Sequence, residues 1–380
     1  MLIHHLHRFE WGTRLCNSGE SGARQPIRIS PEIKAGQMHN RSHSLVTTTL
    51  GLFLLFLSPS VAKTASQSGV GGTPVATWLN DGQLHVLLCG TGSPLPDANR
   101  AEACTAIIAG GEVILVDVGS GSWRKAVVNN LPAQNLSAIL LTHFHSDHIG
   151  DLGEALVQSW VAGRSHKINV YGPPGVEQVV AGFELAYSLD TGYRVQHHGE
   201  QWMPRAGAGA IAQPIRLKSN EAAELVFERN GLKVTAFKVE HDPAKPAYGY
   251  RFEYRGRVVV VSGDTARSAN LARHAIGADL LIHDVIAKNL LQMAASNFDQ
   301  AGNLRRAKLS RDIVTYHASP LEAAEIAAYA KVETLVFTHM VPPPVSPQIE
   351  QAFLRGVSDV FKGKVVLGTD GMRFDLPPRN

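Results

Sequence analysis

The segment that most constrains the fold is LSAILLTHFHSDHIG, which covers residues 136–150. An apolar run leads there into three histidines and one aspartate within six positions: His143, His145, Asp147 and His148. An uninterrupted apolar run predicts a buried strand, and binding side chains in α/β folds commonly follow the carboxyl ends of strands. A histidine-rich surface turn would explain one or two of these residues, but not all four. The cluster therefore predicts a metal site.

Strand-like apolar runs and helix-like segments alternate through the rest of the chain. Gly110-Gly111 and Arg255-Gly256 each separate two short runs and predict hairpins. Ser319-Pro320 predicts the start of a helix, as an N-cap followed by the first helical residue. Residues 185–225 and 287–316 show no readable pattern, and we interpret them as loops. The alternation predicts an α/β domain with two sheets inside and helices outside.

The front of the chain has the features of an export signal. An apolar run without charge, Leu45–Leu57, follows Met38 and ends near Ser60 and Ala62, the small residues expected before a cleavage site. The run is too short for a spanning helix, although an uncut membrane anchor is the alternative. We therefore predict a signal peptide over residues 38–62 and a periplasmic or secreted product, with no membrane contact after cleavage.

The predicted signal peptide is not at the start of the sequence. We interpret residues 1–37 as an upstream extension that the natural protein lacks, with translation starting at Met38. Residues 63–83 are rich in Gly, Ser and Thr and predict a linker, and residues 84–380 predict one domain. Cys89 and Cys104 lie near the facing ends of two consecutive strand-like runs. A disulfide in an exported protein and two separate buried thiols both remain open.

The charge of the chain is unevenly distributed. The net charge is +3, but the first 62 residues carry six Lys or Arg and three Glu, which leaves 30 basic and 30 acidic residues in the remainder. Proteins that grip nucleic-acid backbones usually carry a clear positive excess. The neutral remainder therefore argues against a nucleic-acid partner.

The pattern His-x-His-x-Asp-His at 143–148 resembles the signature of the metallo-β-lactamase superfamily, and the resemblance runs from about Leu84 to the end. It implies later ligands at strand ends, and candidates occur in the expected order: His241 after TAFKVE, Asp264 in VVVVSGDT and His339 in TLVFTHM. The implied fold is an α/β, metallo-β-lactamase αββα sandwich, in which two central mixed sheets are flanked by helices. Residues 84–380 would then form one hydrolase domain.

The resemblance also implies a site for two divalent metal ions. One ion is expected on His143, His145 and His241, the other on Asp147, His148 and His339, and Asp264 is expected to bridge them. Zinc suits these donors best, although manganese or iron could occupy them. Paired ions lower the pKa of a shared water, so a metal-bridged hydroxide and a hydrolytic reaction are expected.

Downstream motifs resemble the ribonuclease Z and phosphodiesterase branch: HDPAKPAYGYRFE, SGDT, HDV and YHASPLEAAEIA. In that branch the histidine matched by His317 is thought to assist the leaving oxygen, so the resemblance implies catalytic roles for Asp147 and His317 as base and acid. A plain helix-start residue is the alternative for His317. Asp284 is expected to orient His317, with a structural carboxylate as the alternative.

One departure from that branch affects the expected substrate. Bacterial-type ribonuclease Z enzymes carry a long insertion between the GYR and GDT strands, which forms an arm that grips tRNA. Here Asp264 follows Arg251 by only thirteen residues, which leaves room for a plain hairpin. The missing arm, the neutral charge and the export signal together argue against tRNA.

We therefore predict an exported hydrolase of a small-molecule phosphodiester or aryl sulfate ester, because arylsulfatases of this fold share the same motifs. A ribonuclease Z-type tRNA 3′ endonuclease and a non-enzymatic metal-binding protein are the alternatives. Relatives are often dimers, so a homodimer is expected by analogy alone.

Overall fold

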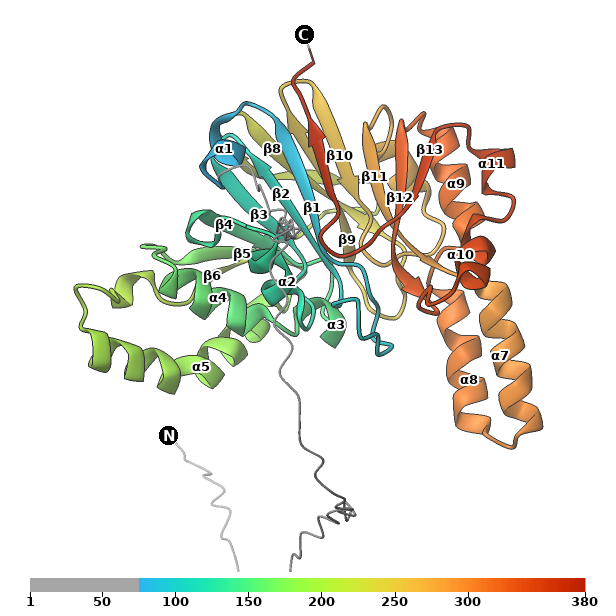
Figure 1. Cartoon of the computed structure of the whole chain (residues 1–380), viewed down its shortest axis with the longest axis horizontal. Coiled ribbons are helices and arrows are strands. Elements are labelled where there is room, and N and C mark those ends of the chain that lie inside the picture. The colour runs from blue at the N-terminus through green and yellow to red at the C-terminus, as the bar shows by residue number, and fades with distance from the viewer. Residues whose placement is uncertain (1–74, 380) are drawn as a thin grey trace, which may run out of the picture. The chain divides into compact units, whose positions relative to one another are not determined.

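Two seven-stranded mixed sheets form the centre of the domain (Figure 1). The computed structural model describes residues 75–379, so the predicted extension, the signal peptide and most of the predicted linker lie outside the described residues. The first sheet contains, in spatial order, β14 (Arg373–Leu376), β1 (Leu84–Gly90), β2 (Cys104–Ala109), β3 (Glu112–Val116), β4 (Leu136–Leu140), β5 (Ile168–Gly172) and β6 (Ala210–Pro214). The second contains β13 (Lys364–Leu367), β12 (Thr334–Val341), β11 (Leu280–Ile286), β10 (Arg257–Val261), β9 (Ala247–Tyr254), β8 (Leu232–Val239) and β7 (Ala223–Arg229).

Helices cover the outer face of each sheet (Figure 1). The first sheet packs against α1 (Val75–Asn80), α2 (Ser122–Val128), α4 (Leu152–Val161) and α5 (Val176–His198). The second packs against α6 (Ala269–His274), α9 (Pro320–Tyr329), α10 (Pro347–Leu354) and α11 (Val357–Val360). The remaining helical segments are α3 (Ser146–Ile149), α7 (Lys288–Gln300), α8 (Leu304–Asp312), η1 (Ala133–Asn135), η2 (Arg205–Gly207) and η3 (Ile313–Thr315). The predicted αββα sandwich is confirmed.

Strand β1 shows why the core strands are apolar at every position. Leu84, Val86 and Leu88 pack into the core between the two sheets, whereas Leu87 and Cys89 pack into the core under the helices of the first sheet. Successive side chains of a strand point to opposite faces, so a strand that is covered on both sides needs apolar residues throughout. The uninterrupted runs in the sequence follow from this double burial.

Two segments interpreted as loops contain regular structure instead. Residues 185–225 include the second half of α5 and strand β6, and residues 287–316 include α7 and α8. The long helix α5 buries only Val176, Val180 and Val195. A helix that buries so few side chains needs no continuous apolar stripe, so the periodicity that predicts helices is absent. In Figure 1, both α5 and the α7–α8 pair extend away from the sheets.

The direction of the strands brings several strand ends to one edge of the domain. Strands β10, β11 and β12 are parallel neighbours, and β8 shares their direction because β8 and β10 are both antiparallel to β9. The turn between β9 and β10 consists of Arg255 and Gly256, which both have positive φ, as a tight two-residue hairpin requires. No long insertion therefore separates these two strands.

The described chain begins inside the predicted linker. Residues 75–80 form helix α1, and Trp78 is buried and stacks on His85. Cys89 and Cys104 form a disulfide between β1 and β2, which decides between the two alternatives left by the sequence. Among residues 75–379, no helix has the length and apolar character needed to cross a membrane.

Candidate metal centre

The seven predicted metal ligands meet at the shared edge of the two sheets. They come from four strands: His143, His145, Asp147 and His148 follow β4, His241 follows β8, Asp264 follows β10, and His339 lies near the end of β12. Six of them are buried, and His145 is exposed. The first sheet therefore supplies one contiguous segment, part of it in α3, whereas the second supplies one residue from each of three strands.

The first group of converging donors contains His143, His145, His241 and Asp264, as expected for one ion. Their candidate ligand atoms all lie within 4.8 Å of one another. The His145 Nδ1 atom lies 2.8 Å from His143 Nε2 and 3.4 Å from His241 Nε2. Three imidazole nitrogens from two sheets thus face a common point beside the Asp264 carboxylate.

A second group contains Asp147, His148 and His339, also as expected. The His339 Nε2 atom lies 3.0 Å from Asp147 Oδ2, and His148 Nε2 lies 3.6 Å from the same oxygen. Asp264, His339, Asp284 and His317 also converge as a third set. That set was not expected as a ligand group, and its last two members bind each other through a hydrogen bond.

Asp264 lies at the junction of these groups. Its Oδ2 atom is within 4.0 Å of one nitrogen from each of five histidines: His143 (3.9 Å), His148 (3.2 Å), His241 (3.8 Å), His317 (4.0 Å) and His339 (3.5 Å). The preceding Gly263 has φ of +61°, and a Cβ there would lie 2.8 Å from the Thr142 Cβ. Glycine therefore lets the Asp264 turn approach the loop of the first sheet.

Outer hydrogen bonds determine which imidazole nitrogens face the centre. His241 Nδ1 donates to the Tyr316 carbonyl at 3.0 Å, and His148 Nδ1 donates to Asp117 Oδ2 at 2.8 Å. The Thr142 hydroxyl donates to Asp117 and therefore accepts from His143 Nδ1. In each case the Nε2 lone pair is left facing the converging groups, as a metal ligand requires.

Asp117 is a site residue that the sequence interpretation missed. It has φ of 57° and follows β3, just as the histidine cluster follows the neighbouring parallel strand β4. Its carboxylate also accepts from the Thr142 backbone N–H at 2.8 Å. The sequence contained a signal for this residue. Asp117 directly follows the apolar run EVILV, just as the histidine cluster follows the apolar run of β4.

The electrostatics of the site favour neutral imidazoles in the first group and an ionised aspartate at the junction. Burial lowers the pKa of His143 well below its ordinary value, and burial also lowers the pKa of His241. Burial opposes ionisation of Asp264, but His339 and His148 outweigh it and hold the pKa of Asp264 well below its usual range. For His339, Asp264 and Asp147 outweigh burial and raise the pKa to about 9.

His317 lies beside the converging groups and is oriented by Asp284. Its Nδ1 atom donates to Asp284 Oδ2 at 2.7 Å, and its Nε2 atom lies 4.0 Å from Asp264 Oδ2. The Asp284 carboxylate is buried and also accepts from the Thr265 backbone N–H at 3.2 Å. The expected contact between Asp284 and His317 is present.

The residues fit a pair of divalent metal ions. Imidazole nitrogens and carboxylate oxygens are the donors that such ions use, and the Asp264 carboxylate of the first group also lies 3.2 Å and 3.5 Å from His148 and His339 of the second. Within the described residues, the buried His148 Nε2 atom forms no well-aligned hydrogen bond, although Asp264 Oδ2 lies 3.2 Å away. A buried nitrogen without a partner is costly unless it binds something, and a cation would remove that cost.

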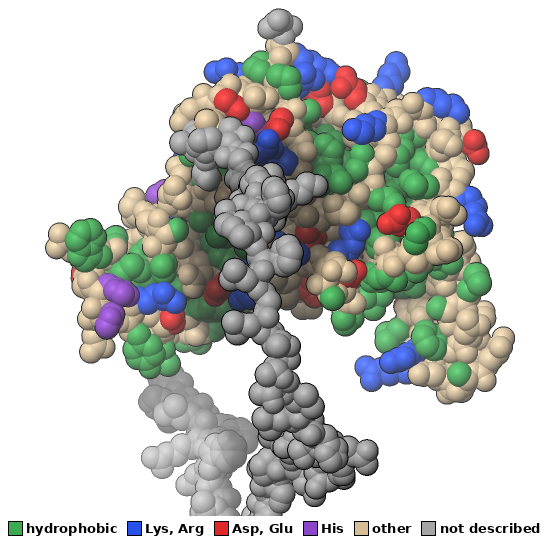
Figure 2. Space-filling model, in the orientation of Figure 1, with side chains coloured by type: hydrophobic (Ala, Val, Ile, Leu, Met, Phe, Trp, Pro, Cys, Tyr) green, Lys and Arg blue, Asp and Glu red, His purple; other side chains and the backbone are tan. Residues whose placement is uncertain are grey.

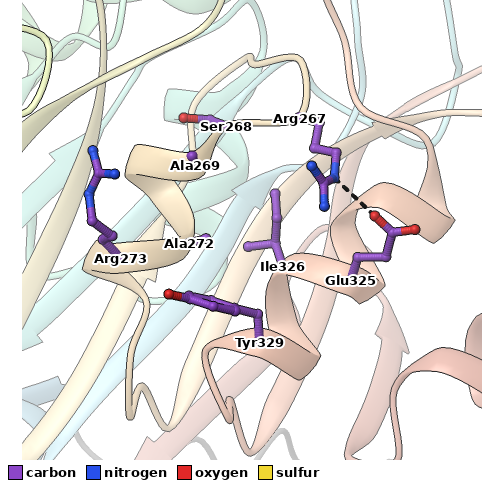
Figure 3. A pocket seen from close by; sticks show the side chains of 8 residues that line it. All are labelled: Arg267, Ser268, Ala269, Ala272, Arg273, Glu325, Ile326 and Tyr329. Carbon is purple, nitrogen blue, oxygen red and sulfur yellow. Dashed lines mark hydrogen bonds and ion pairs between the residues drawn. The ribbon is translucent and has the colours of Figure 1, made fainter.

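One cavity adjoins the predicted site, whereas a second lies away from it. One of about 370 Å³ adjoins His241 and is also lined by Lys238, Asp242 and Lys245. Another of about 300 Å³ lies between α6 and α9, where Figure 3 shows Arg267 paired with Glu325 and the Tyr329 ring across from Ala272. None of the predicted site residues lines this second cavity.

Comparison with known proteins agrees with the geometry. The family model described as "Beta-lactamase superfamily domain" matches residues 113–340. Ribonuclease Z of Mycolicibacterium paratuberculosis (strain ATCC BAA-968 / K-10) is 39% identical over 290 residues, which cover 76% of this chain and 96% of that protein.

Two solved structures are similar in fold. The short form of human tRNase Z has a TM-score of 0.56 at 22% identity, and Zn²⁺-bound PqqB from Methylobacterium extorquens has 0.52 at 17%. Each match covers 77% of this chain, with 99% and 100% of the respective structures. At these identities the likeness shows the fold alone. Taken with the sequence relatives, these findings place the chain in the metallo-β-lactamase superfamily, in its ribonuclease Z branch.

Proposed function

We propose that this metal-dependent phosphodiester hydrolase cleaves precursor tRNA at the 3′ end, as an endonuclease of ribonuclease Z type. The observation that carries the proposal is the buried pair of His317 and Asp284 beside the two donor groups. The relative named Ribonuclease Z, matched over 96% of its length, supports tRNA as the substrate. The sequence alone favours a small exported ester and leaves tRNA as the alternative. The similarity to ribonuclease Z makes tRNA the preferred substrate of this proposal.

Each predicted site residue has a role in this proposal. His143, His145 and His241 would hold one ion, Asp147, His148 and His339 would hold the other, and Asp264 would contribute its carboxylate to both. Zinc is the proposed metal, because it suits these donors and because a zinc-bound protein shares the fold. The ions would supply an activated water and neutralise charge on the phosphate.

The remaining work falls to side chains of this chain. Asp284 accepts the His317 Nδ1 hydrogen, so Nε2 is the nitrogen that can give a proton to the leaving oxygen. Asp147 Oδ2, which lies 3.0 Å from His339 Nε2, would take the proton of the attacking water. Acid and base then come from opposite sheets and meet across the phosphate.

A cleavage assay tests the proposal directly. The full chain is incubated with a precursor tRNA that carries a 3′ trailer, with and without chelator, and zinc is then added back. We expect cleavage at the 3′ end of the tRNA that the chelator abolishes and zinc restores. Intact precursor at high enzyme concentration, under conditions where a bis-aryl phosphate is hydrolysed, would contradict the proposal.

A second candidate is an exported hydrolase of a small phosphodiester or aryl sulfate. The Cys89–Cys104 disulfide favours it, because disulfides persist mainly in oxidising compartments. The predicted signal peptide over residues 38–62 and the two-residue β9–β10 turn agree with it.

Cell fractionation with N-terminal sequencing separates the two candidates. Export predicts a product outside the cytoplasm that begins at Lys63, after the small residues Ser60 and Ala62. A cytoplasmic product that retains residues 38–62 would exclude the second candidate. A panel of bis-aryl phosphate and aryl sulfate would then distinguish the two ester classes for an exported enzyme.

A further inference from the structure

We infer that the α7–α8 helical hairpin, residues 288–312, is the surface that holds the RNA backbone beside the metal centre. This inference rests on the proposed function, because it assigns a binding surface to the tRNA substrate. The hairpin would replace the insertion that is absent between β9 and β10, where only Arg255 and Gly256 connect the strands.

The hairpin begins and ends at the site. Helix α7 starts two residues after β11, the strand that carries Asp284. After α8, the short η3 segment leads directly to Tyr316, whose carbonyl binds His241, and then to His317. The thirteen residues of α7 span about 20 Å at 1.5 Å per residue. The hairpin thus extends from the site toward solvent (Figure 1).

Helix α8 carries a concentration of positive charge. Its nine residues, LRRAKLSRD, contain four exposed basic side chains and one acidic residue: Arg305, Arg306, Lys308, Arg311 and Asp312. Residues 63–380 as a whole contain equal numbers of basic and acidic residues. The helix is therefore a local positive surface on a neutral chain, and Figure 2 shows Lys and Arg side chains at this projecting part of the molecule.

Two of these cations are available for a partner. Within the described chain, Arg305 and Arg306 take part in no ion pair, whereas Lys308 pairs with Asp312 and Arg311 with Asp299. Arg306 lies over the Phe298 ring of α7, and the Arg311–Asp299 pair also joins the two helices. The hairpin is held together by these contacts, so Arg305 and Arg306, which pair with no carboxylate among the described residues, are presented on a preformed surface.

Phosphates are the partner that this surface fits best. Exposed arginines on one projecting helix match the regularly spaced charges of a nucleic-acid backbone, and backbone contacts position a substrate without reading its sequence. Because α8 is anchored beside His317, it would fix the distance along the RNA between the phosphates that it binds and the bond that is cleaved.

The test compares the double variant Arg305→Ala/Arg306→Ala with a matched control, Lys233→Ala/Lys364→Ala. The control removes two exposed lysines at the starts of β8 and β13, away from the edge that carries the ligands. The full chain is assayed on precursor tRNA and on bis-p-nitrophenyl phosphate. RNA binding is measured separately in a His317→Ala background over a range of salt concentrations, so that the RNA stays intact.

We expect the α8 variant to raise KM for precursor tRNA about tenfold and to reduce the salt slope of binding by about two, one for each lost phosphate contact. Hydrolysis of the small diester should stay unchanged, which shows that the variant is folded. Arg305→Lys/Arg306→Lys should keep most of the binding, and the control pair should match the wild type.

The outcomes separate this inference from the proposed function. If the wild type cleaves tRNA and the α8 variant binds as tightly as the control, the inference is wrong and the proposed function stands. If the wild type does not cleave tRNA but binds RNA through α8, the proposed function fails and the RNA-binding surface stands. If the wild type binds no RNA, both fail.

Discussion

The two sheets contribute to the same site in different ways. The first sheet places four predicted ligands in one segment of six residues after β4, which runs into α3. The second sheet contributes His241, Asp264 and His339 from three strands that are far apart in the sequence. A contiguous loop makes its residues easy to recognise, whereas dispersed ligands depend on correct strand order and direction. A disulfide also links β1 and β2 within the first sheet, whereas Asp284 of the His317–Asp284 pair lies on the second sheet.

The largest expected effect tests the single residue that joins both groups. Asp264→Asn should remove both ions and lower kcat/KM on a bis-aryl phosphate more than about 10⁴-fold, because its Oδ2 atom approaches ligands from both sheets. Asp147→Asn, in the loop of the first sheet, should lose one ion and retain the other. Metal content per chain, measured by mass spectrometry, checks both. Two bound ions in Asp264→Asn would rule out the bridging role.

The next effect concerns the proposed acid on the second sheet. His317→Ala should lower kcat on precursor tRNA by about 10²–10⁴-fold, because a poor leaving oxygen needs a proton. The same change should affect a p-nitrophenyl ester much less, since p-nitrophenolate leaves without protonation. Rate constants on the two substrates give the comparison. Equal losses on both would assign His317 to metal binding or structure instead.

The disulfide should make the first sheet sensitive to reduction. Cys89→Ala/Cys104→Ala should lower the free energy of unfolding by about 3 kcal/mol, the value expected for a sequence separation of 15 residues. Denaturant titration of the variant, and of the wild type with and without reductant, measures this loss. An unchanged midpoint in reductant would mean that the bond contributes little to stability.

The smallest effects come from two aspartates with matched positions behind the site. Asp117→Asn should weaken metal binding about 10–100-fold, because Asp117 orients His148 on the first sheet. Asp284→Asn should instead lower kcat by about 10–100-fold at unchanged metal content, because it orients His317. Metal titration and turnover are measured on both variants. If both lose metal equally, the division between the two sheets is wrong.

Predictions from the sequence succeeded where a residue was marked by its own neighbours. Buried strands are recognisable in the sequence as apolar runs. Polar residues at their ends, such as His143, His241 and Asp264, are therefore easy to identify as candidate site residues. Asp117 carries the same mark and was missed only because it lacks a histidine beside it. Helices α5 and α8 were not predicted because they bury few side chains, whereas α7 has an amphipathic pattern that the sequence interpretation did not recognise. The apolar periodicity of a helix reflects its buried face, and a helix that projects from the domain buries little surface.

The sequence by itself determined the strands, the fold class and the candidate ligands, because each depends on local pattern or on a short motif. The tertiary structure decided which atoms meet. Only the parallel directions of β8, β10 and β12 bring three distant residues to the loop after β4. Only the contacts of Asp117, Thr142 and Tyr316 fix which nitrogens face the centre. Such contacts join residues far apart in the chain, and a linear pattern carries no record of them.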